Sequence, residues 1–347
     1  MTFTLLMFYW ILTVVVVSIV FYVLLGGADF GAGIVEIFTP RRLDSRAVQA
    51  LTYRSMGPVW EANHIWVIIL AVVLMSVFPS AWSRIATALH IPIALMLLGI
   101  VLRGASFMFR HYDAYDDRSR GVYTAVFAVS SLLTPIFLGT TAGAVILGQI
   151  SLEPTNYYDG FVAPWLNPFA LAVGLFTASI CTFLAAAYLI GEAALNPELQ
   201  RHFRRLALIS NGVTVVAGGL VFLAAFVQNR AIFDRFFGAW EVLDALILAT
   251  LALPVFWWAV NHSRYALTRL VAGFQILVVL LAWLGVQYPV LVNLRDGEPL
   301  TVYNTAAPDV TLNVLGVVLI IGVLVIFPLL GYLLYTFKRQ ETLGAEL

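Results

Sequence analysis

Two acidic residues stand where a carboxylate is costly, and they define the functional question. Asp29 lies near the end of a long apolar run, within residues 26–33 (GGADFGAG), and Glu61 lies near the start of the next run, within residues 57–66 (GPVWEANHIW). An acid at the centre of a membrane helix costs about 2.5–3.5 kcal/mol on insertion scales. Chains retain such acids for proton or ion pathways, for pairing with a cation, or for packing against a partner.

Asp29 lies within a glycine pattern that brings helices together. Gly27 and Gly31 are four residues apart, and Gly139 and Gly143 repeat this spacing in a later apolar run. Small residues at this spacing let two membrane helices approach closely, so we interpret both pairs as packing contacts. A carboxyl inside such a contact is shielded from lipid and can be neutral or charged, which a proton relay requires.

Polar side chains surround Glu61. Trp60 and His64 are four residues apart on one helix face, Glu61 and His64 are three apart, and Asn63 adds an amide. A histidine beside a carboxylate is a plausible relay or ligand partner. The alternative is a structural role, because Pro58 suits a first helical turn and the carboxylate of Glu61 would be stabilised there by the helix dipole.

Arg103 ends a third apolar run and has two interpretations. Its long side chain could extend to the lipid headgroups, as basic residues near helix ends do. Alternatively, its guanidinium is a counter-charge for Asp29 or Glu61. The sequence leaves both open.

The composition shows which kind of protein must position these residues. Of 347 residues, 61% are hydrophobic and 11% are charged, against about 25% charged in soluble domains. The chain is therefore an all-α polytopic membrane protein without a large soluble domain, and we expect no nucleic-acid partner. The single cysteine, Cys181, excludes an intrachain disulfide and a site built from several cysteines. We expect no metal site, because no other histidine has a partner at ligand spacing.

Hydropathy predicts about nine membrane spans, each of about 20 mainly apolar residues. No Lys or Arg precedes the first, so we expect a retained helix rather than a cleaved signal peptide. The short connections predict one membrane domain over residues 1–347. The predicted spans are 5–30, 59–78, 86–106, 122–149, 165–192, 207–228, 240–260, 267–291 and 312–337.

Basic residues predict the orientation. Of the 19 Lys and Arg residues, 15 follow or close the odd-numbered spans, including Arg41 and Arg42 after the first. Because cytoplasmic loops are enriched in basic residues, the N-terminus is predicted outside and the C-terminus in the cytoplasm. Asp29 and Glu61 then both lie at the cytoplasmic end.

A weak internal repeat predicts the helix arrangement. Residues 24–29 in the first span loosely resemble residues 188–192 in the fifth, and an Arg-rich loop follows each. We therefore expect two four-helix bundles plus one helix, with a pseudo-repeat of 1–150 and 160–292 and a final helix at 312–337.

The motifs together resemble subunit II of the cytochrome bd-type quinol oxidases. Residues 26–33 resemble that family's G-x-D-F-G-x-G stretch, and residues 57–66 resemble its G-P-x-W-[DE]-x-N-x-x-W stretch. Arg103 falls where the family has an arginine ending its third helix. Residues 300–312 and 328–332 resemble the loop before the last helix and a part of that helix, whereas roughly 120–290 match only in hydropathy and topology.

The resemblance implies a heterodimer in a prokaryotic plasma (inner) membrane. The partner, subunit I, would bind the b-type and d-type haems and oxidise ubiquinol or menaquinol, and the complex would reduce dioxygen to water. This chain would bind no haem axially. Small single-helix accessory subunits, membrane lipids and a structural quinone or lipid are further expected partners.

The resemblance also implies roles for individual residues. Positions matching Asp29 and Glu61 belong to a cytoplasmic proton channel in that family, with Arg103 in the same neighbourhood. We expect Asn63, His64 and Trp60 to line this path. Glu61 and His64 replace an Asp and a Gln found in some relatives, a conservative change for proton transfer.

Two other classes of function remain open from the sequence. A proton-coupled secondary transporter would have interrupted helices meeting at mid-membrane in both halves, whereas here only the first half carries a strong polar motif. A non-catalytic assembly scaffold is the second alternative. Absorption by b- and d-type haems in a complex purified through this chain would distinguish the oxidase subunit from both.

Overall fold

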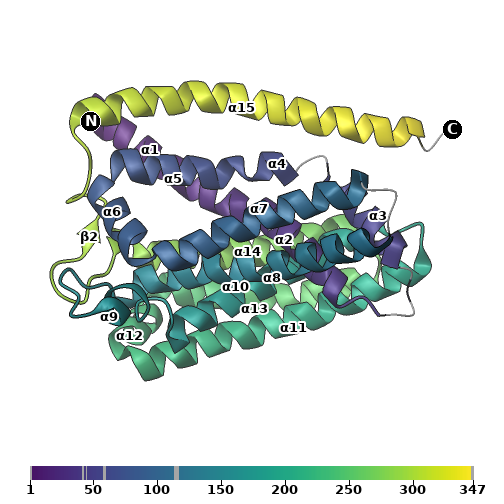
Figure 1. Ribbon diagram of the computed structural model, residues 1–347, viewed down its shortest axis with the longest axis horizontal. Helices are drawn as coiled ribbons and strands as arrows, with labels where there is room; N and C mark the ends of the chain where they lie inside the picture. The colour runs from purple at the N-terminus through teal and green to yellow at the C-terminus, as the bar shows by residue number, and fades with distance from the viewer. Residues whose placement is uncertain (1, 41–42, 44, 58–59, 113–116, 345–347) are drawn as a thin grey trace.

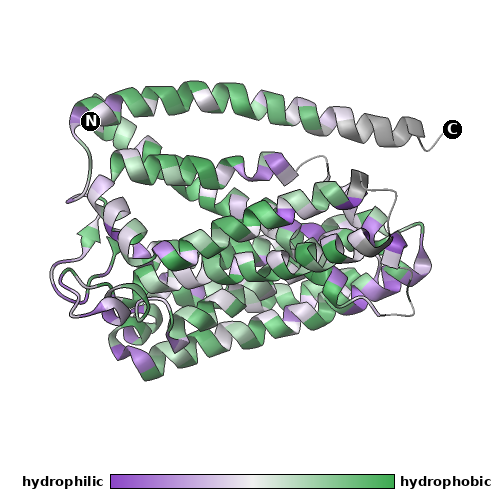
Figure 2. Cartoon of the chain, in the orientation of Figure 1, coloured by the Kyte–Doolittle hydropathy of each residue, from purple (hydrophilic) through white to green (hydrophobic). Residues whose placement is uncertain are grey.

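Long apolar helices form almost the whole fold. The computed structural model describes residues 2–40, 43, 45–57, 60–112 and 117–344. Arg41, Arg42 and Pro58, on which parts of the topology and motif predictions rest, lie outside these residues. Figure 2 shows hydrophobic residues along the helices and hydrophilic ones gathered at the two ends of the bundle.

Nine segments of the described chain are long and apolar enough to cross a membrane, which agrees with the nine predicted spans. The segments are Phe3–Ile37, Trp60–Val77, His90–Arg110, Ser119–Leu147, Pro168–Glu192, Pro197–Gln228, Trp240–Asn261, Tyr265–Gln287 and Asp309–Leu333. Two boundaries differ most from the prediction: the first span continues to Ile37, and the sixth begins at Pro197.

The spanning segments are built from the following elements: α1 (Phe3–Phe21), η1 (Tyr22–Gly26) and α2 (Gly27–Ile37), then α4 (Trp60–Asn63) and α5 (Ile65–Val77), α7 (His90–Tyr112), α8 (Asp117–Leu147), α10 (Pro168–Glu192), α11 (Pro197–Gln228), α13 (Trp240–Asn261), α14 (Tyr265–Gln287) and α15 (Asp309–Gly344). Shorter elements connect them: α3 (Ser45–Met56), α6 (Pro79–Ala88), α9 (Tyr157–Phe161), α12 (Arg230–Gly238), β1 (Val290–Val292) and β2 (Leu300–Thr301). The two strands form a small antiparallel hairpin, which the all-α prediction did not include.

α10 is the central helix of the molecule. It packs against α2 and α8 on one side and against α11 and α14 on the other. Residues 178–187 of this helix are all buried, which is unusual for a membrane helix in a single chain. The arrangement as two separate four-helix bundles stays a prediction, because α10 contacts helices from both proposed bundles closely. By contrast, α15 lies along the outside of the molecule, packed mainly on α1 and α5 (Figure 1).

The contact between α2 and α10 depends on Gly31. A Cβ atom at this position would lie 1.8 Å from the Cys181 carbonyl oxygen and 2.7 Å from the Ala185 methyl group. Gly27, one turn earlier, is less crowded, since its Cβ would lie 3.5 Å from the Cys181 sulfur. The predicted packing role of these glycines is confirmed, and Gly31 sets the separation of the two helices.

The second glycine pair has the same role between α8 and α10. A Cβ on Gly139 would lie 2.7 Å from the Val173 carbonyl oxygen, and one on Gly143 would lie 3.0 Å from the Ala170 Cα. The central helix is therefore approached closely from two sides. This explains why α10 is buried over several turns.

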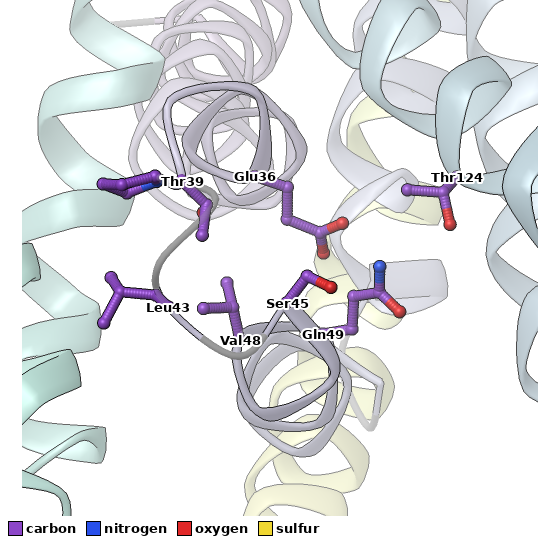
Figure 3. A pocket seen from close by; sticks show the side chains of 8 residues that line it. Glu36, Thr39, Leu43, Ser45, Val48, Gln49 and Thr124 are labelled. Carbon is purple, nitrogen blue, oxygen red and sulfur yellow. The ribbon is translucent and has the colours of Figure 1, made fainter.

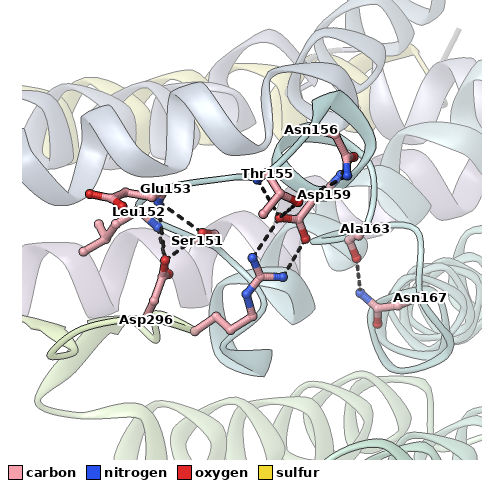
Figure 4. A network of polar contacts seen from close by, with 10 residues as sticks. Ser151, Leu152, Glu153, Thr155, Asn156, Asp159, Ala163, Asn167 and Asp296 are labelled. Atoms are coloured by element: carbon pink, nitrogen blue, oxygen red, sulfur yellow. Dashed lines mark hydrogen bonds and ion pairs between the residues drawn. The ribbon is translucent and has the colours of Figure 1, made fainter.

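A polar clasp formed by Arg295 and Asp296 joins the chain after β1 to α9 and to the loop before α9 (Figure 4), at the end of the bundle opposite α3 (Figure 1). Arg295 donates two hydrogen bonds to Asp159, at 2.6 and 2.9 Å. The neighbouring Asp296 accepts hydrogen bonds from the Ser151 hydroxyl and the Leu152 backbone N–H, both at 2.8 Å. The hydrogen bonds from Arg295, and then that from the Thr155 backbone, hold the pKa of Asp159 well below its usual range.

We predict that Gly31→Ala disrupts the α2–α10 contact, whereas Gly27→Ala is tolerated. The added methyl group cannot fit against a backbone carbonyl, and overpacking of this kind costs about 1–3 kcal/mol or more. The thermal midpoint of the purified protein should fall for Gly31→Ala and change little for Gly27→Ala. Equal midpoints would show that the two helices can move apart without cost.

We predict that the clasp is insensitive to pH across the physiological range. A carboxylate with a lowered pKa contributes stability that is fully present above the unfolded value of about 3.9 and is lost as the pH falls through the folded value. Titration of Asp159 should therefore not change the thermal midpoint between about pH 5 and 8, the range in which proteins are usually most stable. Asp159→Asn should lower the midpoint slightly at every pH in this range.

The control for the clasp is Asp234→Asn. Asp234 pairs with Arg230 at 3.6 Å, but both side chains are about two-thirds exposed, and such pairs contribute little. The two substitutions remove the same charge, so only loss of the clasp should lower the midpoint. A fall of equal size in both variants would contradict the prediction.

Candidate functional site

The polar site lies on the face of α2 that begins with Asp29. A π-helical turn, η1, precedes α2 and carries one more residue per turn than an α-helix. All residues from Gly27 to Val35 are buried, and Asp29 is 1% exposed. Packing on α8 and α10 therefore keeps the carboxyl away from lipid, as the sequence predicted.

Asn63 binds the Asp29 carboxyl directly. Its Nδ2 donates to Oδ2 of Asp29 at 2.6 Å, which ties the end of α4 to the start of α2. The second oxygen, Oδ1, is buried and has no hydrogen-bond partner among the described residues. One side of the carboxyl is thus fixed, and the other can accept or release a proton.

Arg103 lies beside Asp29 and is buried. It is 2% exposed, and its Nη2 donates to the Asp29 backbone carbonyl at 2.8 Å. The guanidinium also lies over the rings of Phe30 and Phe127, 5.1 and 5.5 Å from their centroids. This burial contradicts an extension to the headgroups and supports the second interpretation, a positive charge held next to Asp29.

Trp60 and His64 lie on the other side of this cluster. Trp60 packs on α7, where a Cβ added to Gly104 would lie 3.0 Å from the indole ring. The His64 ring Nδ1 lies 2.8 Å from the Trp60 carbonyl oxygen, and because a carbonyl only accepts, Nδ1 carries the hydrogen. Its Nε2 is buried and has no partner within the described part of the chain. A neutral His64 would therefore present a proton-accepting nitrogen inside the cluster.

Glu61 is placed differently from Asp29. Its side chain is exposed, although Asn63, two residues later, is buried. No side chain in the described ranges forms a hydrogen bond or ion pair with its carboxylate. The structure thus brings Asp29, Asn63, Arg103, Trp60 and His64 together, and leaves Glu61 at the edge of the group.

A second acid–arginine pair lies two turns further along the same helices, and the sequence analysis missed it. Arg110 donates to both carboxylate oxygens of Glu36, at 2.6 and 3.2 Å, and both side chains are 5% exposed. Its guanidinium lies 4.5 Å from the centroid of Phe127, the ring that Arg103 also contacts. Asp29 and Glu36 are seven residues apart, as are Arg103 and Arg110. This repeated spacing is the signal that could have revealed the pair.

Glu36 also lines a cavity where α2 ends. The cavity has a volume of about 280 Å³ and lies between α2, α3 and α8. Figure 3 shows the Glu36 carboxylate near the polar side chains of Ser45, Gln49 and Thr124. A space of this size and polarity can hold several water molecules, each of which occupies about 30 Å³ in the liquid.

The described residues contain no group of three His, Cys, Asp or Glu side chains that could hold a metal ion. The ring of His64, the histidine of the cluster, has the rings of Tyr22, Phe30 and Trp60 around it with centroids 6.0–6.2 Å away.

Comparison with known proteins gives a consistent result. The family model described as cytochrome bd terminal oxidase subunit II matches residues 6–337. Cytochrome bd ubiquinol oxidase subunit 2 of Bacillus subtilis (strain 168) is 24% identical over 308 residues, which cover 89% of this chain and 88% of that protein. Cytochrome bd-I ubiquinol oxidase subunit 2 of Escherichia coli (strain K12) is 26% identical over 216 residues, 61% of this chain and 55% of that protein.

A solved structure has the same fold. A chain of the bd oxidase from Geobacillus thermodenitrificans superposes with a TM-score of 0.76 at 21% sequence identity. The match covers 97% of this chain and 99% of that one. The arrangement of helices described above is therefore shared over almost the entire length.

Proposed function

Because the chain belongs to the cytochrome bd terminal oxidase subunit II family, we propose that it supplies the cytoplasmic proton path for the reduction of dioxygen to water by that complex. The chain is a component of an oxidoreductase complex, as the family assignment implies. Membership also favours this function over the proton-coupled transporter and the assembly scaffold. The observation that carries the proposal is the buried Asp29, held on one side by Asn63 with its other oxygen unpaired.

The haem-bearing subunit I is the proposed partner. The b-type and d-type haems, and quinol oxidation, would lie there, as membership of this family implies. The outer helix α15 exposes large apolar side chains, including Leu324, Phe327 and Tyr332, and so offers an apolar surface for a partner or lipid. Small accessory subunits and a structural quinone or lipid stay predictions. An apolar cavity of about 360 Å³ between α13 and α14 is where a lipid chain would fit.

The proposed orientation follows from the basic residues. In the described chain, Arg46 and Arg54 lie on α3, and Arg201, Arg204 and Arg205 lie on the first turns of α11, at the end of the bundle where α2 also ends (Figure 1). The positive-inside rule makes this end cytoplasmic in a prokaryotic inner membrane, with the N-terminus outside. Protons for the reaction would then enter from the side that the acidic residues face.

Each residue has a defined part in the proposed path. Asp29 would carry the proton, and Asn63 would hold its carboxyl in position. Arg103 would stabilise the charged form, because its guanidinium is held next to Asp29 by the two aromatic rings. His64, with Trp60 fixing its ring through the backbone carbonyl, would offer the next acceptor. Glu61, which is exposed, would act at the surface by gathering protons rather than by relaying them inside.

We predict that Asp29→Asn slows quinol-dependent oxygen consumption by about 10²-fold or more, the usual scale for loss of a proton-transfer group. The amide keeps the shape and can still meet Asn63, but it cannot carry a proton. Glu61→Gln should have a smaller effect, because water can replace an exposed carboxylate. Oxygen consumption should be measured on the purified complex with its haem content checked by absorption.

The matched control is Glu198→Gln. Glu198 is exposed in the first turn of α11, as Glu61 is in α4, but it lies away from the cluster. Normal turnover of the Asp29→Asn complex with intact haems would overturn the relay role. Loss of the haems in that variant would instead assign Asp29 to assembly.

A further inference from the structure

The Glu36–Arg110 pair is the strongest feature that the proposed path does not use. It is a two-bond ion pair, buried to 5% exposure on both sides, at the end of the bundle that receives the Arg-rich segments. Burying a charged pair costs several kcal/mol in desolvation, which its mutual attraction only partly repays. Apolar contacts alone could hold two apolar helices together, so the pair is not needed for packing. Its position beside a polar cavity suggests a role in proton transfer.

The cavity places Glu36 beside a space that can hold water. Its walls include the Glu36 carboxylate and the side chains of Thr39, Ser45, Gln49 and Thr124. The charged groups facing Glu36 are Arg110 and, further away, Arg103, both from α7. Glu36 thus faces a polar cavity on one side and the helix interior on the other (Figure 3).

The interior side of Glu36 leads along α2 to Asp29. Seven residues of α-helix rise about 10.5 Å, too far for a single proton transfer. Gly33 lies between the two acids, and the Ser131 hydroxyl of α8 occupies the space its missing side chain leaves: a Cβ on Gly33 would lie 2.2 Å from that oxygen. The hydroxyl is buried and unpaired among the residues described. Buried polar atoms without partners are where bound water is expected.

We propose that Glu36 is the carboxyl through which protons enter this subunit. It would take protons from the cavity between α2, α3 and α8 and pass them by way of Ser131 to Asp29. The inference rests on the proposed function, since Asp29 is the recipient. The transfer is a series of proton hops: the carboxylate of Glu36 takes a proton from a hydronium ion in the cavity, which becomes water, and the carboxyl releases that proton through the Ser131 hydroxyl and adjacent water to Oδ1 of Asp29. Arg110 is a positioning residue, because its two hydrogen bonds orient the Glu36 carboxylate without taking part in the transfer.

The test is proton uptake by the purified complex. The fully reduced complex is mixed with oxygen, and uptake is followed with a pH-indicator dye while haem oxidation is followed by absorption. Glu36→Gln should slow uptake by about tenfold or more while the haem content stays unchanged, although the thermal midpoint falls because Arg110 is left buried without its counter-charge. Glu36→Asp, which keeps an acid, should recover most of the rate. A purely structural pair would lower the thermal midpoint in the same way but leave uptake by the intact complex normal, and normal uptake would overturn the inference.

The chain provides a matched control in Glu192→Gln. Glu192 pairs with Arg269 at 2.5 Å at the end of α10, but the two side chains are 38–39% exposed and do not line this cavity. Its loss should leave uptake unchanged. Equal slowing by Glu192→Gln would show a general effect of removing surface charge and would overturn the role of Glu36.

Comparing Asp29→Asn with Glu36→Gln distinguishes failure of this inference from failure of the proposed function on which it rests. Slow uptake in both Asp29→Asn and Glu36→Gln supports the route. Slow uptake in Asp29→Asn alone overturns the role of Glu36 in proton entry and leaves the relay intact, whereas normal uptake in Asp29→Asn overturns both. If Glu36→Gln fails to assemble, Ser131→Ala removes only the intermediate hydroxyl, and normal uptake in that variant would contradict the route.

Discussion

The close approach of Gly31 to the Cys181 carbonyl determines how near α2 lies to α10, and the burial of the site depends on that distance. With the two helices this close, residues 27–35 are covered on all sides by protein. A polar group on this segment must then take its hydrogen-bond partners from inside the bundle, because lipid offers none. The bond from Asn63 to Asp29, the contact of Arg103 with the Asp29 carbonyl and the pairing of Glu36 with Arg110 all meet this requirement.

Two acids on α2 are matched by two arginines on α7. α2 contributes two acids and α7 contributes two arginines at the same seven-residue spacing, so each acid lies near one guanidinium. Phe127 lies between the two guanidinium groups and contacts both through its ring. A ring face is one of the few apolar surfaces that stabilises a cation. The Phe127 ring thus stabilises both guanidinium groups, although they lie on one face of α7 in an apolar environment.

Much of the fold could be predicted because hydropathy and charge placement act over whole helices. Asp29, Asn63, His64 and Arg103 were predicted to lie together and do so, since their motifs lie at the ends of neighbouring spans. Glu36 was missed because the first span was predicted to end at residue 30, which placed this acid in a loop, where acids are ordinary. Glu61 was grouped with Asp29 by its position along the membrane normal. Its exposure could not be foreseen, because the direction of a side chain depends on how the four-residue helix α4 is turned.

The π-helical turn at Tyr22–Gly26 sets an angular offset within the first span. Each helical residue advances about 100° around the axis, so one additional residue rotates everything after it by that amount relative to everything before it. α1 directs its buried face to α15 and α5, and α2 directs its own to α8 and α10. The first span therefore packs against two sets of helices that lie in different directions around its axis. Shortening the turn by a single residue would leave both helices intact while pointing Asp29 and Glu36 away from their arginines.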